Sequence, residues 1–521
     1  MQADEFLREV FHAERRVYNA GDPTPLMRIH DSNVFVKRED QGPINAYKWR
    51  GAFNSIAAKH AAGELHHITC ASAGNHAQGV AIAARKLDLP ATIFMPRSTP
   101  ATKVDAVKRH GNGNVDIRLV GDDYDSAAEA ATMFCDNNGA TFIHAFDDLQ
   151  TVAGQATIAK EVIQQFDEDF DYAFLQIGGG GMAAGVSSLL KQAYPNIKII
   201  GVEGEGQASM KASVDHGERI TLSQVDTFAD GSAVKRPGAI PFELCRDNID
   251  NYMTVSNYEI SDAIRRLWDE MRVTPEPSGA MGYAGLMKYA HNQADPDFLK
   301  NNKILTVITG ANMDFSRLGQ IAMDSVAAKH KRSYYRFHMD EGRGNLLGLL
   351  KDVMPDINVS DFMYGKTNEG TAFPVIAFEA TSERIAEFEE KLAQNNIGFE
   401  DVTYSPAIRA RVIPYDIDLV KDSQFYQIQF PERSGALREL LEKIKDFSEI
   451  TYFNYSFSGE SVGRALMAFE TDNPQRLHNI IKDNLPASEP LDQDTVDTIM
   501  LQSKFSRKDS PVSQTSAVPS P

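Results

Sequence analysis

Between about residues 24 and 312, short runs of β-branched and aromatic residues alternate with stretches of helical length. Eight of these runs predict strands, at residues 34–39, 66–72, 91–96, 115–121, 141–146, 172–178, 198–204 and 304–310. Amphipathic patterns between them predict helices, for example at residues 76–87, 151–166 and 259–271. Such alternation predicts repeated βαβ units, and therefore an α/β fold with mainly parallel sheets and helices on both faces.

A lysine in residues 45–52 (NAYKWRGA) is the first candidate for chemistry in this part of the chain. Lys48 lies between two aromatic residues, Tyr47 and Trp49. A desolvated lysine has a lowered pKa and can serve as the nucleophile and base of Schiff-base chemistry. A single lysine is far more often a solvated surface residue, so Lys48 is a candidate catalytic residue only in combination with other segments.

Two predicted strands run directly into helices through small residues, where unpaired backbone N–H groups can bind anions. In SAGNHAQG (72–79), such a helix start suits a substrate carboxylate, Asn75 adds a side-chain donor, and the candidate substrate-binding residues are Ser72, Ala73, Gly74 and His76. The second junction consists of four consecutive glycines followed by Met182, and the glycines are Gly178, Gly179, Gly180 and Gly181. Without side chains, their backbone amides can approach a phosphate closely. Since the spacing is neither GxGxxG nor GK[ST], a dinucleotide and an NTPase loop are both disfavoured.

A hydroxyl follows the last predicted strand, at Thr309 of TGAN (309–312). Strand-end loops of parallel sheets meet at one edge, so the four segments are expected to share a site. An amine, a carboxylate cradle, a phosphate cradle and a hydroxyl together fit pyridoxal phosphate and an amino-acid substrate.

These segments also resemble a known family. TPL (24–26), KRED (37–40), YK-x-RGA, SAGNHAQG, GGGGMAAGV, FADGSAVKRPG (228–238), EPSGA (276–280) and TGAN look like the fold-type-II pyridoxal-phosphate enzymes of the threonine/serine dehydratase group, over residues 20–320. The resemblance implies that Lys48 binds the cofactor covalently and that Asn75 hydrogen-bonds its 3′ oxygen. It further implies that Gly178–Met182 hold its phosphate and that Thr309 faces its pyridine nitrogen.

The chain departs from this family at two places near the cofactor. Ala46-Tyr47-Lys48-Trp49 stands where Ser-Phe-Lys-Leu is usual, and Thr309 stands where Ser or Cys is commoner. Ala73 occupies the position at which serine racemases of the group carry serine, which favours a dehydratase over a racemase. The implied reaction is conversion of L-threonine to 2-oxobutyrate and ammonia, the first step of isoleucine biosynthesis.

After about residue 332 the chain repeats itself. Aligning Gly344 with Gly435 gives an offset of 435 − 344 = 91, and the same offset superposes Phe362 on Phe453 and Tyr364 on Tyr455. A gapless register of this kind predicts two small α+β modules in tandem, at residues 333–415 and 420–502. They follow a catalytic domain at 1–332 with two α/β subdomains, and residues 503–521 are polar enough to predict a disordered tail.

The repeated segment resembles the ACT-like regulatory modules of biosynthetic threonine dehydratase. The resemblance implies an amino-acid effector, isoleucine and possibly valine, bound by the paired modules. Tyr364 and Tyr455 are the candidate regulatory residues, with core or dimer contacts as the alternative for both. A homotetramer is the oligomer that the family suggests.

Composition excludes several other classes. A net charge of −19 argues against nucleic-acid binding, and the sequence contains no apolar run long enough to span a membrane. Cys70, Cys135 and Cys245 are odd in number and lack CxxC spacing, so we expect a reduced, cytoplasmic environment without disulfides. Glu203 and Glu205 lie near a strand end, but two acids are too few to predict a metal site.

Two other functions remain open from the sequence. A serine-preferring dehydratase or a β-replacement enzyme of the same fold would use the same residues. A non-catalytic amino-acid sensor is the alternative from a different class, and the retention of Lys48, Asn75 and the four glycines argues against it.

Overall fold

The computed structural model describes residues 3–122, 124–328, 332–354, 359–379, 382–403, 405–409, 411–420, 422–431, 436–456, 462–493 and 495–496. The chain divides into two compact units, unit 1 at Met1–Ala328 and unit 2 at Lys329–Pro521. This division lies four residues before the domain boundary expected at 332. The predicted tail, 503–521, lies outside the described residues.

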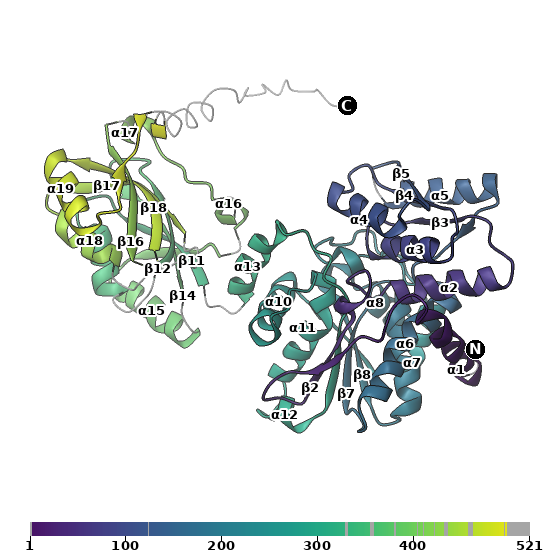
Figure 1. Ribbon diagram of the computed structural model, residues 1–521. Helices are drawn as coiled ribbons and strands as arrows, with labels where there is room; N and C mark the ends of the chain where they lie inside the picture. The colour runs from purple at the N-terminus through teal and green to yellow at the C-terminus, as the bar shows by residue number, and fades with distance from the viewer. Residues whose placement is uncertain are drawn as a thin grey trace, which may run out of the picture. The chain divides into compact units, whose positions relative to one another are not determined.

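Unit 1 contains a six-stranded sheet that carries two of the chemistry-bearing loops. Its strand order is β1 (Leu26–Arg28), β2 (Val34–Arg38), β10 (Ile304–Ile308), β7 (Tyr172–Gln176), β8 (Lys198–Gly204) and β9 (Asn251–Val255). All neighbours are parallel except β1 and β2. Helices α6 (Leu149–Gln165), α7 (Gly181–Ala193), α10 (Asn257–Met271) and α11 (Pro277–His291) lie around this sheet in Figure 1.

A second, four-stranded sheet in unit 1 is entirely parallel, in the order β5 (Val115–Leu119), β4 (Ala91–Met95), β3 (Ile68–Ala71) and β6 (Thr141–Phe142). It lies with α3 (Asn75–Lys86), α4 (Ala101–Gly111) and α5 (Tyr124–Asn138) in a separate part of the unit (Figure 1). The other helices of unit 1 are α1 (Ala3–Val17), α2 (Trp49–Ala61), α8 (Ser209–His216), α9 (Ala239–Asn248), α12 (Phe298–Asn301) and α13 (Arg317–Ala328), with short turns η1 (Glu39–Gln41), η2 (Glu205–Gln207) and η3 (Asp230–Ser232).

All eight predicted strands are present, so the predicted α/β class with parallel sheets is confirmed. One of them is shorter than expected, because β6 ends at Phe142. The ring nitrogen Nδ1 of His144 accepts the backbone N–H groups of Phe146 and Asp147, at 3.3 and 2.8 Å, and this turns the chain away from the sheet. The edge strands β1 and β9 are strands that the sequence pattern did not predict.

Unit 2 is built on one nine-stranded antiparallel sheet to which both repeats contribute. The first repeat supplies β11 (Arg332–Asp340), β12 (Val359–Gly365), β13 (Thr371–Ala372), β14 (Val375–Glu379) and β15 (Gly398–Asp401). The second repeat supplies β16 (Gln424–Pro431), β17 (Ser448–Ser456), β18 (Val462–Thr471) and β19 (Glu489–Pro490). The two halves join through antiparallel pairing of β12 with β17, in which Phe362 opposes Tyr455 and Tyr364 opposes Phe453.

The helices of unit 2 follow the 91-residue register. Helix α14 (Asn345–Gly348) with η4 (Leu349–Val353) spans 345–353, and adding 91 gives 436–444, the bounds of α18 (Ala436–Ile444). Likewise α15 (Ser382–Gln394) corresponds to α19 (Pro474–Asn484). Apolar residues of these helices and of both repeats' strands form one buried cluster, which includes Phe362 and Phe453 with their ring centroids 4.4 Å apart.

The helices of the large apolar cluster pack on one face of the sheet. The segment between the repeats crosses the other face, where β12 pairs with β17. It includes α16 (Pro406–Arg409) and α17 (Ile417–Val420). Arg411 donates to both carboxylate oxygens of Asp361 on β12, at 2.9 and 2.7 Å, and to Asn454 Oδ1 on β17, at 2.5 Å. Pro414 lies so close to Gly365 that a Cβ there would be 2.4 Å from its carbonyl oxygen. The connection therefore ties the two repeats together at their shared strands.

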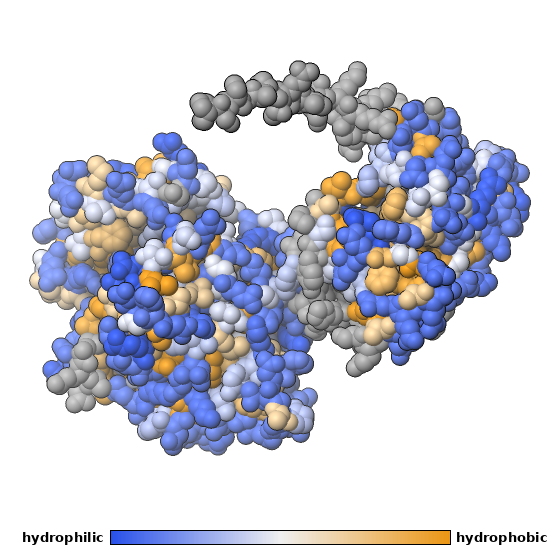
Figure 2. Space-filling model, turned by 180° about the vertical axis from the view of Figure 1, so that it is seen from behind, coloured by the Kyte–Doolittle hydropathy of each residue, from blue (hydrophilic) through white to orange (hydrophobic). Residues whose placement is uncertain are grey.

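The face seen in Figure 2 is mostly hydrophilic, with apolar residues in scattered patches, in keeping with the charge of −19. In the described part of the chain, no helix is both long and apolar enough to cross a membrane. Within the same residues, no group of three or more His, Cys, Asp and Glu side chains could hold a metal ion.

Candidate active site

The segment that carries Lys48 is held against the loop that follows β10. The backbone N–H of Tyr47 donates to the carbonyl of Thr309 at 3.0 Å, and Ala46 forms an isolated antiparallel bridge with Gly310. Lys48 is the N-cap residue of α2, and its side chain makes no capping hydrogen bond. Two of the four predicted segments, more than 250 residues apart in the sequence, therefore lie side by side.

The Lys48 amine lies in a half-buried position at the carboxyl ends of the strands, and its Nζ donates to the carbonyl of Gly231 at 3.3 Å. Burial lowers the pKa of this amine below its ordinary value, while the nearby carboxylates of Glu276 and Asp230 act in the opposite direction. The amine is therefore easier to deprotonate than a surface lysine, as a nucleophile or base requires.

Asn75, at the start of α3, is held by two partners from distant parts of unit 1. Its Nδ2 donates to Glu276 Oε1 at 2.7 Å, and its Oδ1 accepts from Asn312 Nδ2 at 2.8 Å. Asn312 also donates to the carbonyl of Ile44 at 2.6 Å. This network brings the predicted segments 72–79 and 309–312 together at the site of Lys48.

The four-glycine loop links β7 to α7, with Gly180 in the left-handed region at a φ of 93°. A Cβ on Gly178 would be 2.7 Å from Ser232, and one on Gly179 would be 2.4 Å from the Phe146 ring. Glycine is therefore required by both the backbone conformation and the close packing, and the loop presents its amides at the N-terminus of α7.

Thr309 is buried at the end of β10, and its hydroxyl oxygen accepts a hydrogen bond from Gln176 Nε2 at 3.1 Å. The same Gln176 nitrogen donates to the carbonyl of Val307 at 2.8 Å. The hydroxyl is thus fixed in place by a neutral amide rather than by an acid.

The residues predicted to receive the substrate carboxylate lie at the start of α3. Ser72 and Ala73 are half-buried, and a Cβ on Gly74 would meet open space. His76 differs, since its Nε2 is hydrogen-bonded to the carbonyl of Ile143 at 2.9 Å in a buried position. Burial lowers the pKa of His76 to about 3, so its ring is a neutral core group and only its backbone faces the helix start.

A family model described as pyridoxal-phosphate dependent enzyme matches residues 17–310, and the C-terminal regulatory domain of threonine dehydratase matches residues 324–412 and 419–489. The chain is 34% identical to the biosynthetic L-threonine dehydratase of Haemophilus influenzae, over 91% of this chain and 92% of that protein. It is also 34% identical to that of Escherichia coli, over 89% and 91%. The chain belongs to the biosynthetic threonine dehydratase family of pyridoxal-phosphate enzymes.

Solved structures agree with this family. Processed threonine deaminase isoform 2 of Solanum lycopersicum superposes with a TM-score of 0.58 at 38% identity, covering 62% of this chain and 94% of that one. Maize serine racemase superposes with a TM-score of 0.56 at 30% identity, covering 62% and 98%. The predicted family, the fold-type-II architecture with a regulatory part, and the pyridoxal-phosphate cofactor are thereby confirmed.

The residues of the site fit pyridoxal phosphate. A half-buried amine with a lowered pKa, Lys48, is available for the aldehyde. A tight glycine turn at a helix N-terminus is available for the phosphate. The amide of Asn75 offers a donor, and Thr309 offers an uncharged hydroxyl. Each of these groups is therefore chemically compatible with the part of pyridoxal phosphate that it would contact.

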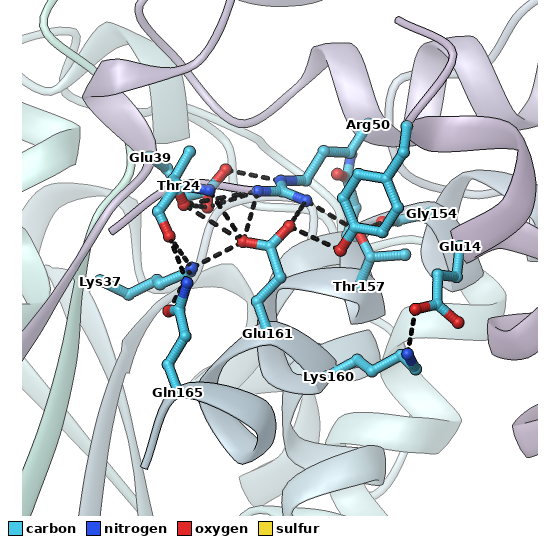
Figure 3. Close-up of polar contacts among 12 residues, drawn as sticks. Glu14, Thr24, Lys37, Glu39, Arg50, Gly154, Thr157, Lys160, Glu161 and Gln165 are labelled. Carbon is cyan, nitrogen blue, oxygen red and sulfur yellow. Dashed lines mark hydrogen bonds and ion pairs between the residues drawn. The ribbon is translucent and has the colours of Figure 1, made fainter. Parts of the chain in front are cut away.

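Arg50, two residues after Lys48 in the sequence, belongs to a buried ionic cluster that is shown in Figure 3. Its guanidinium donates to Glu39 at 2.7 Å and to Glu161 at 2.5 Å, and Lys37 donates to Glu161 at 2.6 Å. All four side chains have at most 1% of their surface exposed. Two positive and two negative charges thus join β2, η1, α2 and α6, and they anchor the first turn of the helix that Lys48 caps.

In unit 2, Tyr364 lines a pocket that is partly open to solvent. Its hydroxyl donates to the carboxylate of Glu341, at 2.7 and 2.6 Å. Burial and the neighbouring Glu449 raise the pKa of Glu341 to about 7. Tyr455 is buried in the same apolar cluster, but it does not line this pocket.

Sequence reasoning assigned no role to Glu276, Asn312, Gln176 or Gly231, although all of them contact the predicted residues. Glu276 and Asn312 belong to motifs of the family resemblance, EPSGA and TGAN, so the resemblance included them without revealing their partners. Gln176 lies within the strand predicted at 172–178 and is the last residue of β7, and strand ends are where parallel sheets place ligand-binding residues.

Proposed function

We propose that this enzyme converts L-threonine to 2-oxobutyrate and ammonia, with Lys48 as its catalytic residue. The observation that carries the proposal is the position of Lys48, whose half-buried amine lies at the meeting point of the 72–79 and 309–312 segments. The similarity to L-threonine dehydratases over about nine tenths of both chains supports threonine as the substrate.

When bound, pyridoxal phosphate withdraws electrons from the substrate Cα, which makes its proton removable. Lys48 Nζ takes this proton, since burial favours the neutral amine. The amides of Gly178–Met182 would hold the phosphate group, and the amide of Asn75 would donate to the 3′ oxygen of the ring.

Thr309 would face the pyridine nitrogen of the bound cofactor. Because its hydroxyl is uncharged and is held by Gln176, it cannot supply the negative charge that keeps that nitrogen protonated. This favours prompt loss of the β-hydroxyl group over transamination. The backbone at Ser72, Ala73, Gly74 and His76 binds the substrate carboxylate at the start of α3.

Serine is the competing substrate, since it differs from threonine by one methyl group and a hydrophobic contact of that size discriminates only modestly. The similarity to maize serine racemase leaves racemisation as a second activity to measure. Ala73 argues against it, because this position lacks the hydroxyl that could serve as the second acid.

Unit 2 is proposed to bind isoleucine and so inhibit unit 1. The pocket beside Tyr364 combines two carboxylates, Glu341 and Glu449, with apolar residues such as Leu347 and Phe362. This is the composition that an ammonium group and a branched apolar side chain require. Tyr455 is proposed as the corresponding residue of the second repeat, and valine as a second ligand.

The test is release of 2-oxobutyrate from L-threonine by the purified holoenzyme, with and without isoleucine. Activity that isoleucine suppresses supports both parts of the proposal. Activity without suppression retains the dehydratase and rejects the effector, whereas faster turnover of serine replaces threonine as the substrate. No release from either amino acid rejects the enzyme assignment and favours the sensor.

We further propose a cytoplasmic homotetramer. Large apolar side chains on unit 1, among them Phe315 with 83% of its surface exposed and Trp268 with 49%, suit burial between subunits. The three free cysteines, two of them buried, suit a reducing compartment. Analytical ultracentrifugation tests the tetramer, and cell fractionation tests the compartment.

A further inference from the structure

Glu276 is a buried carboxylate at the candidate active site, with 6% of its surface exposed. It precedes α11, and its backbone N–H donates to the carbonyl of Gly310 at 3.0 Å. A Cβ on Gly310 would be 2.7 Å from its Oε1, so the loop after β10 closes directly over this carboxylate. Its position is therefore fixed from both sides.

The carboxylate of Glu276 contacts the side-chain amide of Asn75. One end of the amide faces Glu276 and the other faces the amino group of Asn312. A flipped amide would turn its oxygen toward the carboxylate and its own amino group toward that of Asn312, and both contacts would be repulsive. The ionised carboxylate therefore selects one orientation, in which the remaining Nδ2 hydrogen is free for a ligand.

Protonation would remove the carboxylate's part of this selection and leave only that of Asn312, since a carboxylic acid can donate to the amide oxygen as well as accept from the amide nitrogen. The charged and titratable groups around Glu276 are Asp230, Lys48, Lys103 and Tyr47. Burial and Asp230 raise the pKa of Glu276 to about 7, against the opposing effects of Asn75, Lys48 and Lys103. Glu276 would therefore become protonated, and lose its effect on the orientation of Asn75, as the pH falls below about 7.

We infer that Glu276 is a positioning residue for the dehydration. Acting through Asn75, its carboxylate fixes the amide with a hydrogen-bond donor toward the ring oxygen of pyridoxal phosphate. This inference rests on the proposed function, because it takes the cofactor position from the same site.

A double-mutant cycle on cofactor binding tests it. The equilibrium dissociation constant of pyridoxal phosphate is measured by absorbance titration for wild type, Glu276→Gln, Asn75→Ala and the double variant, without substrate. The glutamine is isosteric and pairs with either amide orientation, so we expect about tenfold weaker binding, equivalent to a modest hydrogen-bond loss. In the Asn75→Ala background the same change should have no effect.

The pH dependence adds a readout that a purely structural role would not move. As the pH falls below 7, the affinity of the wild-type enzyme for pyridoxal phosphate should decrease more than that of Glu276→Gln, because the glutamine does not titrate. Glu205→Gln, at an exposed carboxylate, is the control and should bind as wild type does. The inference would be overturned if Glu276→Gln bound pyridoxal phosphate as tightly as wild type does. It would also be overturned if the substitution weakened binding equally in the wild-type and Asn75→Ala backgrounds.

If Glu276→Gln does not fold, Asn312→Ala replaces it, since it removes the other partner of the Asn75 amide and should weaken cofactor binding in the same way. Unchanged binding in Asn312→Ala would then overturn the inference. Cofactor binding is measured apart from turnover, so a failure of the threonine assignment would leave the cycle readable and would be seen separately in 2-oxobutyrate release.

Discussion

Lys48 and Lys59 lie in one short stretch of the chain, but their surroundings differ. Lys48 lies at the strand ends with a lowered pKa, whereas Lys59, near the end of α2, pairs with Asp148 at 2.8 Å. Lys48→Ala should therefore abolish both the visible absorbance of the covalently bound cofactor and turnover. Lys59→Ala should retain both. A Lys48→Ala enzyme that keeps absorbance and turnover would reject the assignment.

Arg50 matters at the same scale for stability. Arg50→Ala would leave Glu39 and Glu161 buried with fewer positive partners, and we expect a loss of about 3–5 kcal/mol in the free energy of unfolding. Arg118→Ala, which removes an exposed pair with Asp116, should cost less than about 1 kcal/mol. Urea denaturation of the two variants gives the comparison, and similar losses would contradict it.

The residue scale also shows where sequence reasoning ends. Lys48, Asn75 and the glycines can be found because each lies in a short motif whose chemistry is local. Glu276 and Asn312 act on Asn75 from 201 and 237 residues away in the sequence. Nothing in a local pattern specifies such a partner, since the contact is created by the return of the chain to the same sheet edge.

At the scale of elements, hydrophobic patterning predicted the strands that are buried on both faces, such as β7 and β10. It did not predict β1 and β9, which lie at sheet edges and have few buried side chains, although it did predict the edge strands β5 and β6. The 91-residue offset predicted two modules. It could not predict that their sheets would join through β12 and β17, because that pairing depends on the packing of both repeats together.

The seam between the repeats depends on Arg411. It is a cationic partner of Asp361, whose side chain is 1% exposed, and Tyr334 also donates to that carboxylate at 3.1 Å. Arg411→Ala should lower the stability of unit 2 by about 3 kcal/mol, because a buried carboxylate loses an ion pair with this arginine. Arg336→Ala, at a more exposed pair with Glu400, is the control. Calorimetry should show a shifted transition for Arg411→Ala, and an unchanged thermogram would contradict the role.

At the scale of the whole molecule, the protonation of unit 2 should control the activity of unit 1. In the proposed effector site, Glu341, with a pKa of about 7, would have to be ionised to receive the ammonium group of isoleucine. Below pH 7 protons compete, so the isoleucine concentration for half inhibition should rise by up to about tenfold per pH unit. Glu341→Gln should respond weakly and without this pH dependence. A half-inhibition concentration that is constant from pH 6 to 8 would contradict the assignment.

The two units also have separate cores, since each hydrophobic cluster among the described residues belongs wholly to one unit. Deleting residues 329–521 should therefore leave a folded dehydratase. Isoleucine inhibition requires the effector to bind the less active state more tightly, a coupling of typically about 1–3 kcal/mol. Without unit 2 that coupling has no binding site, so 2-oxobutyrate release by the truncated enzyme should not respond to isoleucine. A truncated enzyme that is still inhibited would place the effector site in unit 1 and remove the regulatory role proposed for Tyr364 and Tyr455.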